Sequence, residues 1–239
     1  MIECDLHVHS LRSTCGFHTL LEIVAIMRGK HAKGFALTDH GPVLGTPKSH
    51  FSVLLRRLPG VIDGIRVLKG IEASVLTVEG DIDLPVFDGA PYEIVLAGLH
   101  QHDDFIESRG IAENTRALVN AVERNPSIRG ITHPNFQTLP VDLDLLTDLA
   151  AERNIALEVN NSHLRNGKAD IDDAHRLVEL VHAKGAPLMV NSDGHVFSEM
   201  AEYERALALL EPHGIDSFNI VNRTLESTLA FLGLGEKTM

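Results

Sequence analysis

Short apolar runs alternate with longer amphipathic stretches along the chain. In the longer stretches apolar residues return every three or four positions, which is typical of helices that bury one side. The short runs are apolar on both faces, as in Ile94–Leu99, and predict strands that are covered on both sides. Seven strands are expected, over Cys4–His9, Phe35–His40, Val67–Val75, Ile94–His100, Ile128–His133, Ile155–Asn160 and Pro187–Asp193. The expected helices cover Leu20–Arg28, Ile111–Glu123, Leu143–Arg153, Asp172–Ala183 and Ser198–Leu210.

This alternation of strands and helices predicts parallel β/α units. Gly or Asn follows several helices directly before the next apolar run, as at Lys33-Gly34 and Arg153-Asn154, and marks where those helices end. Strands covered on both faces occur in closed barrels and in doubly wound sheets. No glycine-rich phosphate-binding motif follows the first strand, so nothing favours the nucleotide-binding open sheet. Residues 77–91, rich in Gly and Pro, are expected to form a loop or a small hairpin insertion.

Length and charge narrow the class of protein further. A chain of 239 residues is within the range of a single barrel, so one domain over residues 1–239 is expected. The net charge of −12 disfavours binding to nucleic acid or to anionic lipid. No apolar stretch approaches the roughly 20 residues that span a bilayer, and no basic leader is visible, so we expect a cytoplasmic protein. Two cysteines, Cys4 and Cys15, are too few for a disulfide framework.

Histidine is the unusual component of the composition, with 14 residues. In barrels of this kind the active site lies at the C-terminal ends of the strands, and imidazole is the commonest metal ligand. Alternate residues of a strand share a face, so His7 and His9 can face one ion. Histidines of a packed core would not gather at one end of successive strands, so the pattern predicts a metal centre. The residues expected there are His7, His9, His40, Glu72, His100, His133, Asp193 and His195.

The strand ends also carry an ordered set of motifs that resembles a known family. The motifs are Asp5-Leu6-His7-Val8-His9-Ser10, Thr38-Asp39-His40-Gly41-Pro42, Gly70-Ile71-Glu72-Ala73, Ala97-Gly98-Leu99-His100, Thr132-His133-Pro134 and Asn191-Ser192-Asp193-Gly194-His195. This set resembles that of the PHP (polymerase and histidinol phosphatase) superfamily, and within it the stand-alone bacterial phosphatases of the YcdX type. The resemblance covers nearly the whole chain and includes residues 158–162 on the sixth expected strand.

The resemblance implies a distorted (β/α)7 TIM-like barrel with three divalent metal ions, usually zinc, that hydrolyses phosphomonoesters. Manganese and iron remain alternatives, because His and carboxylate ligands accept all three metals. The resemblance assigns His7, His9, Glu72 and Asp193 to one ion. It assigns Glu72, His100 and His133 to a second ion, and His40 and His195 to a third.

The third ion lacks one histidine that the resemblance leads us to expect, because this chain has Cys15 there. A Cys15 thiolate is itself a good zinc ligand and would favour softer ions. His18, three residues further along, is the alternative ligand. In the remaining case neither residue binds, the third site is weak, and Cys15 is a small apolar residue.

The chemistry implied is hydrolysis by a metal-activated water, with Glu72, Asp193 and His195 as the predicted catalytic residues. Three divalent ions would outweigh the negative charge of their ligands and attract a small phosphorylated substrate. Asp193 is expected to serve as a ligand or to pass a proton to the leaving oxygen. Asp5 and Asp39 are expected either to orient ligand imidazoles or to make ordinary strand-end hydrogen bonds. Candidate substrate contacts, each also interpretable as a surface or loop residue, are Arg12, Lys48, His50, His102, Arg109, His163, Arg165 and Lys168.

Other classes of function stay open. An amidohydrolase-type metallohydrolase also uses His-x-His on a barrel strand to activate water. A nuclease is disfavoured by the acidic charge and by the absence of Trp. A non-catalytic, metal-stabilised PHP module is a further alternative. The resemblance also suggests a homo-oligomer.

Overall fold

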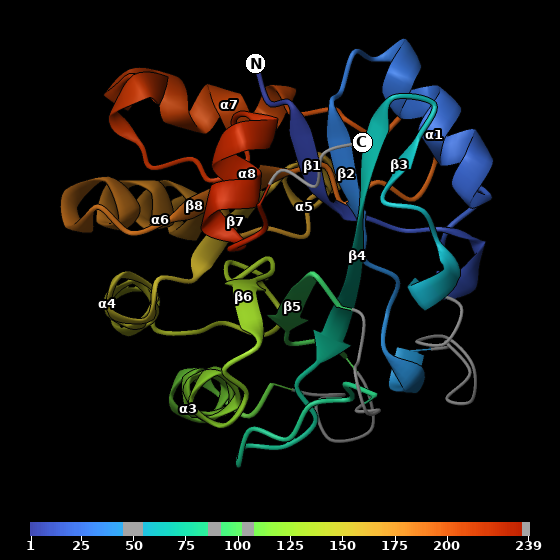
Figure 1. Ribbon diagram of the computed structural model, residues 1–239. Coiled ribbons are helices and arrows are strands. Elements are labelled where there is room, and N and C mark those ends of the chain that lie inside the picture. The colour runs from blue at the N-terminus through green and yellow to red at the C-terminus, as the bar shows by residue number, and fades with distance from the viewer. Residues whose placement is uncertain (45–54, 86–91, 102–107, 236–239) are drawn as a thin grey trace.

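The molecule is a nearly closed barrel of parallel strands, as a computed structural model shows for residues 1–44, 55–85, 92–101 and 108–235 (Figure 1). Seven parallel strands follow the order β1-β2-β4-β5-β6-β7-β8, which confirms the expected α/β barrel. A short strand, β3 (Val61–Ile62), pairs antiparallel with β4 in a hairpin that the hydrophobic pattern does not predict. The barrel strands are β1 (Cys4–Val8), β2 (Gly34–Leu37), β4 (Ile65–Ser74), β5 (Ile94–Gly98), β6 (Ile128–Ile131), β7 (Ala156–Asn160) and β8 (Leu188–Asn191).

Helices surround the barrel and bury its outer face (Figure 1). The last of the expected helices is shorter than predicted, because residues 198–201 form a turn and residues 202–203 have no regular structure. Among the contacts that hold this segment in place, Ala201 N donates to Asp5 Oδ2 at 3.1 Å, and Lys30 Nζ donates to Met200 O at 2.7 Å. The helices are α1 (Leu20–Gly29), α3 (Ile111–Arg124), α4 (Leu143–Arg153), α5 (Asn161–Arg165), α6 (Ile171–Lys184), α7 (Glu204–Leu210) and α8 (Leu225–Phe231).

The first halves of the strands fill the barrel with apolar side chains, which we call the apolar floor. Helix α8 packs Leu229 and Leu232 against this cluster. Each side chain of the floor is less than a tenth exposed, and burying one aliphatic side chain contributes about 1.5–3 kcal/mol. The strand residues of the floor are Cys4, Leu6, Ala36, Leu68, Ile94, Leu96, Ala156 and Met189.

The first and last strands meet along a seam rather than a continuous ladder. A single parallel bridge joins Val8 to Gly194, and His9 N donates to Gly194 O at 3.0 Å. Further down, the side chain of Asn191 accepts a hydrogen bond from Leu6 N at 2.9 Å. β1 also carries an extra residue relative to β2 between Asp5 and Val8. Such a bulge changes which side chains face inward. Leu6 therefore packs in the apolar floor, whereas His7 and His9 face the C-terminal end of the barrel.

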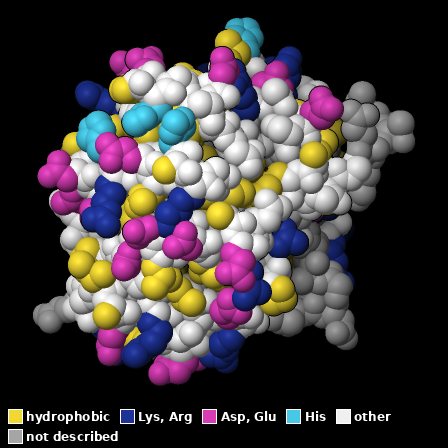
Figure 2. Space-filling view, turned by 90° about the vertical axis from the view of Figure 1, so that its left-hand side faces the viewer, with side chains coloured by type: hydrophobic (Ala, Val, Ile, Leu, Met, Phe, Trp, Pro, Cys, Tyr) yellow, Lys and Arg dark blue, Asp and Glu magenta, His cyan; other side chains and the backbone are white. Residues whose placement is uncertain are grey.

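Mixed charges cover the outer helices. Figure 2 shows Lys and Arg side chains lying beside Asp and Glu side chains on this face. Among the pairs are Arg153 with Glu123, 2.5 Å apart, and Lys184 with Asp148, 2.7 Å apart. Exposed pairs of this kind contribute at most about 1 kcal/mol each. No helix of the described residues is long and apolar enough to cross a membrane.

Candidate metal centre

Glu72, at the C-terminal end of β4, lies at the centre of a ring of histidines that we call the polar rim. Its Oε2 lies 3.2 Å from His7 Nε2 and 2.8 Å from His40 Nδ1. Its Oε1 lies 3.1 Å from Nε2 of both His100 and His133. These imidazoles come from strands or loops far apart in the sequence, because the barrel brings the C-terminal ends of its strands to one edge.

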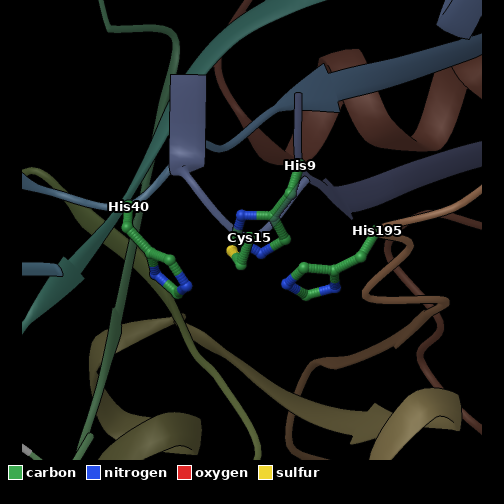
Figure 3. A group of neighbouring side chains, drawn as sticks. All are labelled: His9, Cys15, His40 and His195. Carbon is green, nitrogen blue, oxygen red and sulfur yellow. The ribbon is translucent and has the colours of Figure 1, made fainter. Parts of the chain in front are cut away.

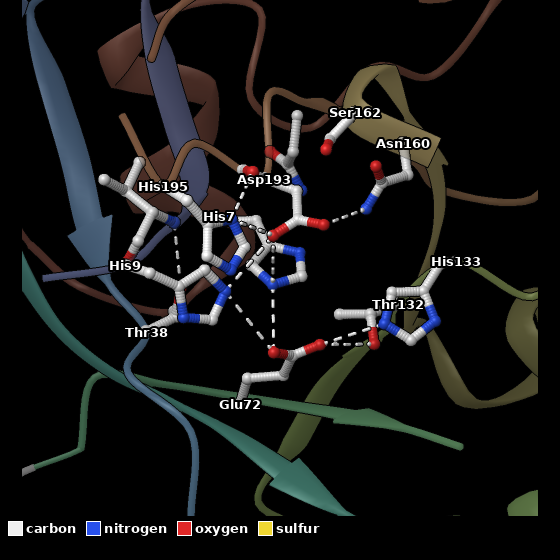
Figure 4. A network of polar contacts seen from close by, with 12 residues as sticks. His7, His9, Thr38, Glu72, Thr132, His133, Asn160, Ser162, Asp193 and His195 are labelled. Atoms are coloured by element: carbon white, nitrogen blue, oxygen red, sulfur yellow. Dashed lines mark hydrogen bonds and ion pairs between the residues drawn. The ribbon is translucent and has the colours of Figure 1, made fainter. Parts of the chain in front are cut away.

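Asp193 forms the second acidic point of the rim (Figure 4). Its Oδ1 lies 3.2 Å from His9 Nε2 and 3.5 Å from both His7 Nε2 and His195 Nδ1. Its Oδ2 accepts a hydrogen bond from Asn160 Nδ2 at 3.2 Å. The eight residues expected at the strand ends are therefore brought together, with six histidines around two carboxylates.

Cys15 belongs to a neighbouring group with His9, His40 and His195 (Figure 3). One ligand atom of each residue lies within 4.8 Å of the others. The turn that carries Cys15 is tight, since a Cβ on Gly16 would lie 2.2 Å from the carbonyl oxygen of Ser10. His18 is placed differently: its Nε2 accepts a hydrogen bond from Phe197 N at 3.0 Å, outside the groups of candidate ligands among the described residues.

Glu158, on β7, orients His7 and His133 of the rim from the side away from Glu72, a role that is not predicted from the sequence. Its Oε1 lies 2.8 Å from His7 Nδ1, and its Oε2 accepts a hydrogen bond from His133 N at 2.8 Å. Asn160 and Asn191 donate to the same carboxylate at 2.9 and 2.8 Å. The sequence feature that could have indicated this role is the position of Glu158, an acidic residue in an apolar strand between Leu157 and Val159, which are both buried.

Asp5 and Asp39 make strand-end hydrogen bonds. Asp5 Oδ2 accepts from the hydroxyl of Ser192, and Asp39 Oδ2 accepts from the hydroxyl of Ser10 at 2.7 Å. His9 Nδ1 instead lies 2.9 Å from Ser13 Oγ. The contacts of Asp5 fit the strand-end role, whereas Asp39 also hydrogen-bonds Ser13, the residue that contacts the His9 ring.

Close packing around Glu72 depends on Gly98 of β5. A Cβ at this position would lie 2.2 Å from Thr132 Oγ1 and 3.0 Å from the ring of His133. Thr132 Oγ1 donates to Glu72 Oε1 at 3.1 Å.

Two rim residues, His133 and Asp193, have left-handed backbone conformations with φ of 33° and 51°. Such conformations are strained for residues other than Gly and gather at functional sites.

The charges of the rim shift one another's pKa values. Burial alone would raise the pKa of Glu72, but the charges of His7, His100 and His40 hold it well below its usual range. Burial would also lower the pKa of His40, but Glu72 and Cys15 raise it to about 10. Burial lowers the pKa of His9 well below its usual range, and the charges of His40 and His195 lower it further.

The hydrogen bonds of the rim fit a cation between its ligands. Glu158 accepts from Nδ1 of His7, which leaves Nε2 of that ring directed at Glu72 Oε2. Nε2 of His7, Nε2 of His9 and Oε2 of Glu72 are buried, and none forms a hydrogen bond in the described structure. Buried polar atoms are normally satisfied, so converging lone pairs of this kind indicate a metal site.

Two further candidates, His163 and Arg165, lie beside the rim. His163 is in α5 and is buried; its ring stacks on that of His133 with centroids 4.5 Å apart. Burial and the charge of His133 lower the pKa of His163 to about 2. Arg165 pairs with Glu199, whose other oxygen accepts from His195 N at 3.0 Å. Lys48, His50 and His102 lie outside the described residues.

The fold and the rim together define an α/β-barrel protein with a candidate metal centre at the C-terminal ends of its strands. A scan against models of protein families finds no match. A probable phosphatase of Syntrophotalea carbinolica is 36% identical over 234 residues, which are 97% of this chain and 96% of the relative. A probable phosphatase of Shewanella frigidimarina is 35% identical over 230 residues, which are 95% and 92%. The chain belongs to the PHP family of probable phosphatases and is a hydrolase of that family.

A solved structure supports the fold. The histidinol phosphate phosphatase of Lactococcus lactis, solved with zinc, L-histidinol and phosphate, superposes with a TM-score of 0.67. The alignment covers 89% of this chain and 94% of that protein at 16% identity. At 16% identity this similarity establishes the barrel fold alone. The zinc, L-histidinol and phosphate are bound to that protein and are not assigned to this chain.

Proposed function

We propose that the protein is a metal-dependent phosphoesterase that hydrolyses a small phosphomonoester at a centre of three divalent ions. Zinc is the expected metal, with manganese and iron as alternatives. The observation that supports this most directly is the set of buried, converging donor atoms around Glu72 that have no hydrogen-bond partner. The zinc and phosphate in the structurally similar histidinol phosphate phosphatase agree with it.

The ligands would be divided as the family resemblance implies. His7, His9, Glu72 and Asp193 would hold one ion. Glu72, with an oxygen facing each side, would bridge to a second ion held by His100 and His133. When bound, such ions supply an activated water and neutralise the charge on phosphoryl oxygens. Cys15, His40 and His195 would hold the third.

The chain's own residues prepare the rim for an anionic substrate. Glu158 and Ser13 fix the rings of His7 and His9, so that both Nε2 atoms face the centre before substrate arrives. Burial alone would raise the pKa of Asp193, but the charge of His7 and the contact with His9, whose Nε2 lies 3.2 Å from Asp193 Oδ1, hold it well below its usual range. An ionised Asp193 that also accepts from Asn160 suits the role of ligand better than that of proton donor.

Metal analysis combined with an activity assay tests the proposal. Protein purified without chelator should contain close to three ions per chain and hydrolyse members of a phosphomonoester panel. Chelation should remove both the metal and the activity, and zinc or manganese should restore both. The proposal fails if no metal binds after both ions are supplied, or if the metal-loaded protein hydrolyses no phosphomonoester. Hydrolysis of amides instead would favour the amidohydrolase-type alternative.

A further inference from the structure

The rim contains two kinds of donor set. Around Glu72 the donors are imidazole nitrogens and carboxylate oxygens. Around Cys15 they are one sulfur and imidazole nitrogens, without a carboxylate in the group. Thiolate is a soft ligand that favours zinc, whereas carboxylate and imidazole also accept manganese and iron. The two parts of the rim therefore differ in which metal they prefer.

The geometry around Cys15 points to an ion rather than to a chance contact. The ring of His9 lies between those of His40 and His195, with centroid distances of 4.5 and 4.3 Å. Nε2 of His9 is fully buried, has no hydrogen-bond partner and lies between this group and Asp193, whose Oδ1 is 3.2 Å away. Nδ1 of His195 lies 3.0 Å from the carbonyl oxygen of Asp193 and donates to it, which leaves Nε2 of that ring as a ligand.

We propose that Cys15, His40 and His195 form a zinc-selective position whose sulfur ligand excludes the harder ions that the Glu72 positions accept. The proposal rests on the proposed function, because it concerns the third ion of that centre. It implies a mixed metal content when zinc is scarce and manganese is abundant: zinc beside Cys15 and manganese around Glu72.

The position also has an open side. Nε2 of His9 is 3.2 Å from Asp193 Oδ1, so that ring can be committed to the first ion. Three protein ligands then remain beside Cys15, and zinc sites with three protein ligands keep a fourth position for water or substrate. Cys15 itself is solvent-exposed, so this open side faces the solvent.

The two cysteines make a direct test possible. Cys4 is buried in the apolar floor and Cys15 is exposed, so a thiol reagent such as dithionitrobenzoate should react rapidly with one thiol in the metal-free protein. Zinc should protect that thiol, whereas manganese at the same concentration should not. A Cys4→Ala variant serves as the control and should behave like the wild type. Equal reactivity with and without zinc would overturn the proposal.

Cobalt substitution gives a second readout that is independent of activity. Cobalt in the wild-type protein should show a near-ultraviolet thiolate-to-cobalt charge-transfer band. Cys15→Ser should lose both the charge-transfer band and one equivalent of bound zinc. Cys15→His should bind that equivalent of zinc again but show no band, and its third position should also accept manganese. His18→Ala should keep both the band and the zinc. Loss of zinc in His18→Ala but not in Cys15→Ser would overturn the assignment.

These readouts separate the two proposals. If the band and the protection by zinc are present but no phosphomonoester is hydrolysed, the proposed function fails and the zinc position stands. If phosphomonoesters are hydrolysed but the wild-type protein shows neither signal, the zinc position fails and the phosphoesterase stands.

Discussion

The two ends of the barrel contain the same strands but opposite chemistry, and the two cysteines illustrate the difference. Cys4, in the apolar floor, is inaccessible, and burial raises the pKa of its thiol to about 11. Cys15, at the polar rim, is exposed, and its histidine neighbours offset the effect of burial and lower its pKa to about 6. The floor supplies stability by excluding water, whereas the rim gathers charges and unpartnered donors at a cost in stability. The comparison predicts that a change in the floor lowers stability while leaving the chemistry of the rim in place.

The largest effect is expected from Glu72→Gln. The two carboxylate oxygens of Glu72 contact four imidazoles between them. Removing this carboxylate should lower metal affinity and phosphatase activity by more than about 100-fold. Elemental analysis and steady-state kinetics measure the two losses, with the exposed Glu152→Gln as a matched control. A Glu72→Gln protein that retains metal and activity would contradict the central place of this residue.

A change in the floor should have the opposite profile. Ile94→Ala removes a buried side chain six residues before His100 on the same strand segment, and should lower the free energy of unfolding by about 2–5 kcal/mol. Denaturant unfolding of the metal-free proteins measures this loss. Metal content per folded chain should stay unchanged, and a parallel loss of metal would show that the two ends are coupled.

Glu158→Gln should fall between these two cases. The amide can still contact His7 and His133 but cannot hold the imidazole with the strength of a charge-assisted hydrogen bond. We expect metal affinity to fall by about 10- to 100-fold, as for other groups that orient metal ligands. Metal-buffered titration measures the affinity. An affinity equal to that of the wild type would mean that Asn160 and Asn191 alone position this part of the rim.

The smallest effect is a pH dependence that distinguishes the two thiols. The thiolate is the reactive form, so a lowered pKa shifts the rise in reactivity to lower pH. In metal-free protein, alkylation of Cys15 should rise about tenfold from pH 5 to pH 7 and then level off, because its pKa is about 6. Cys4 should stay unreactive over this range. Mass spectrometry after iodoacetamide treatment measures both, and a rise centred near pH 9 would contradict the influence of His40 and His195.

Much of this arrangement could be predicted from the sequence, because each strand ends where its apolar run meets a polar residue. The seven parallel strands are confirmed, and Glu72 and His100 lie where alternation along their strands places them. The bulge in β1 could not be predicted, because nothing in the local pattern shows which residue of Asp5–Val8 is extra. The role of Glu158 also depends on contacts with residues more than twenty positions away.

Other parts of the fold escaped prediction for similar reasons. The β3–β4 hairpin involves a strand of two residues, which is too short to show a period. Helix α8 was not expected, although it packs on the floor. Residues 198–203 have an apolar spacing that suits a helix, but their contacts with Asp5 and Lys30 hold them outside the helix. Long-range contacts override local preference at each of these places.

The seam between the first and last strands has a consequence for how the chain is held together. His7 and His9 lie on one side of this seam, and Asp193 and His195, which follow the last barrel strand, lie on the other. An ion shared by these residues would join the first strand of the barrel to the last, where the backbone ladder is interrupted. The supply of metal would then set how firmly the barrel is shut as well as how fast it works.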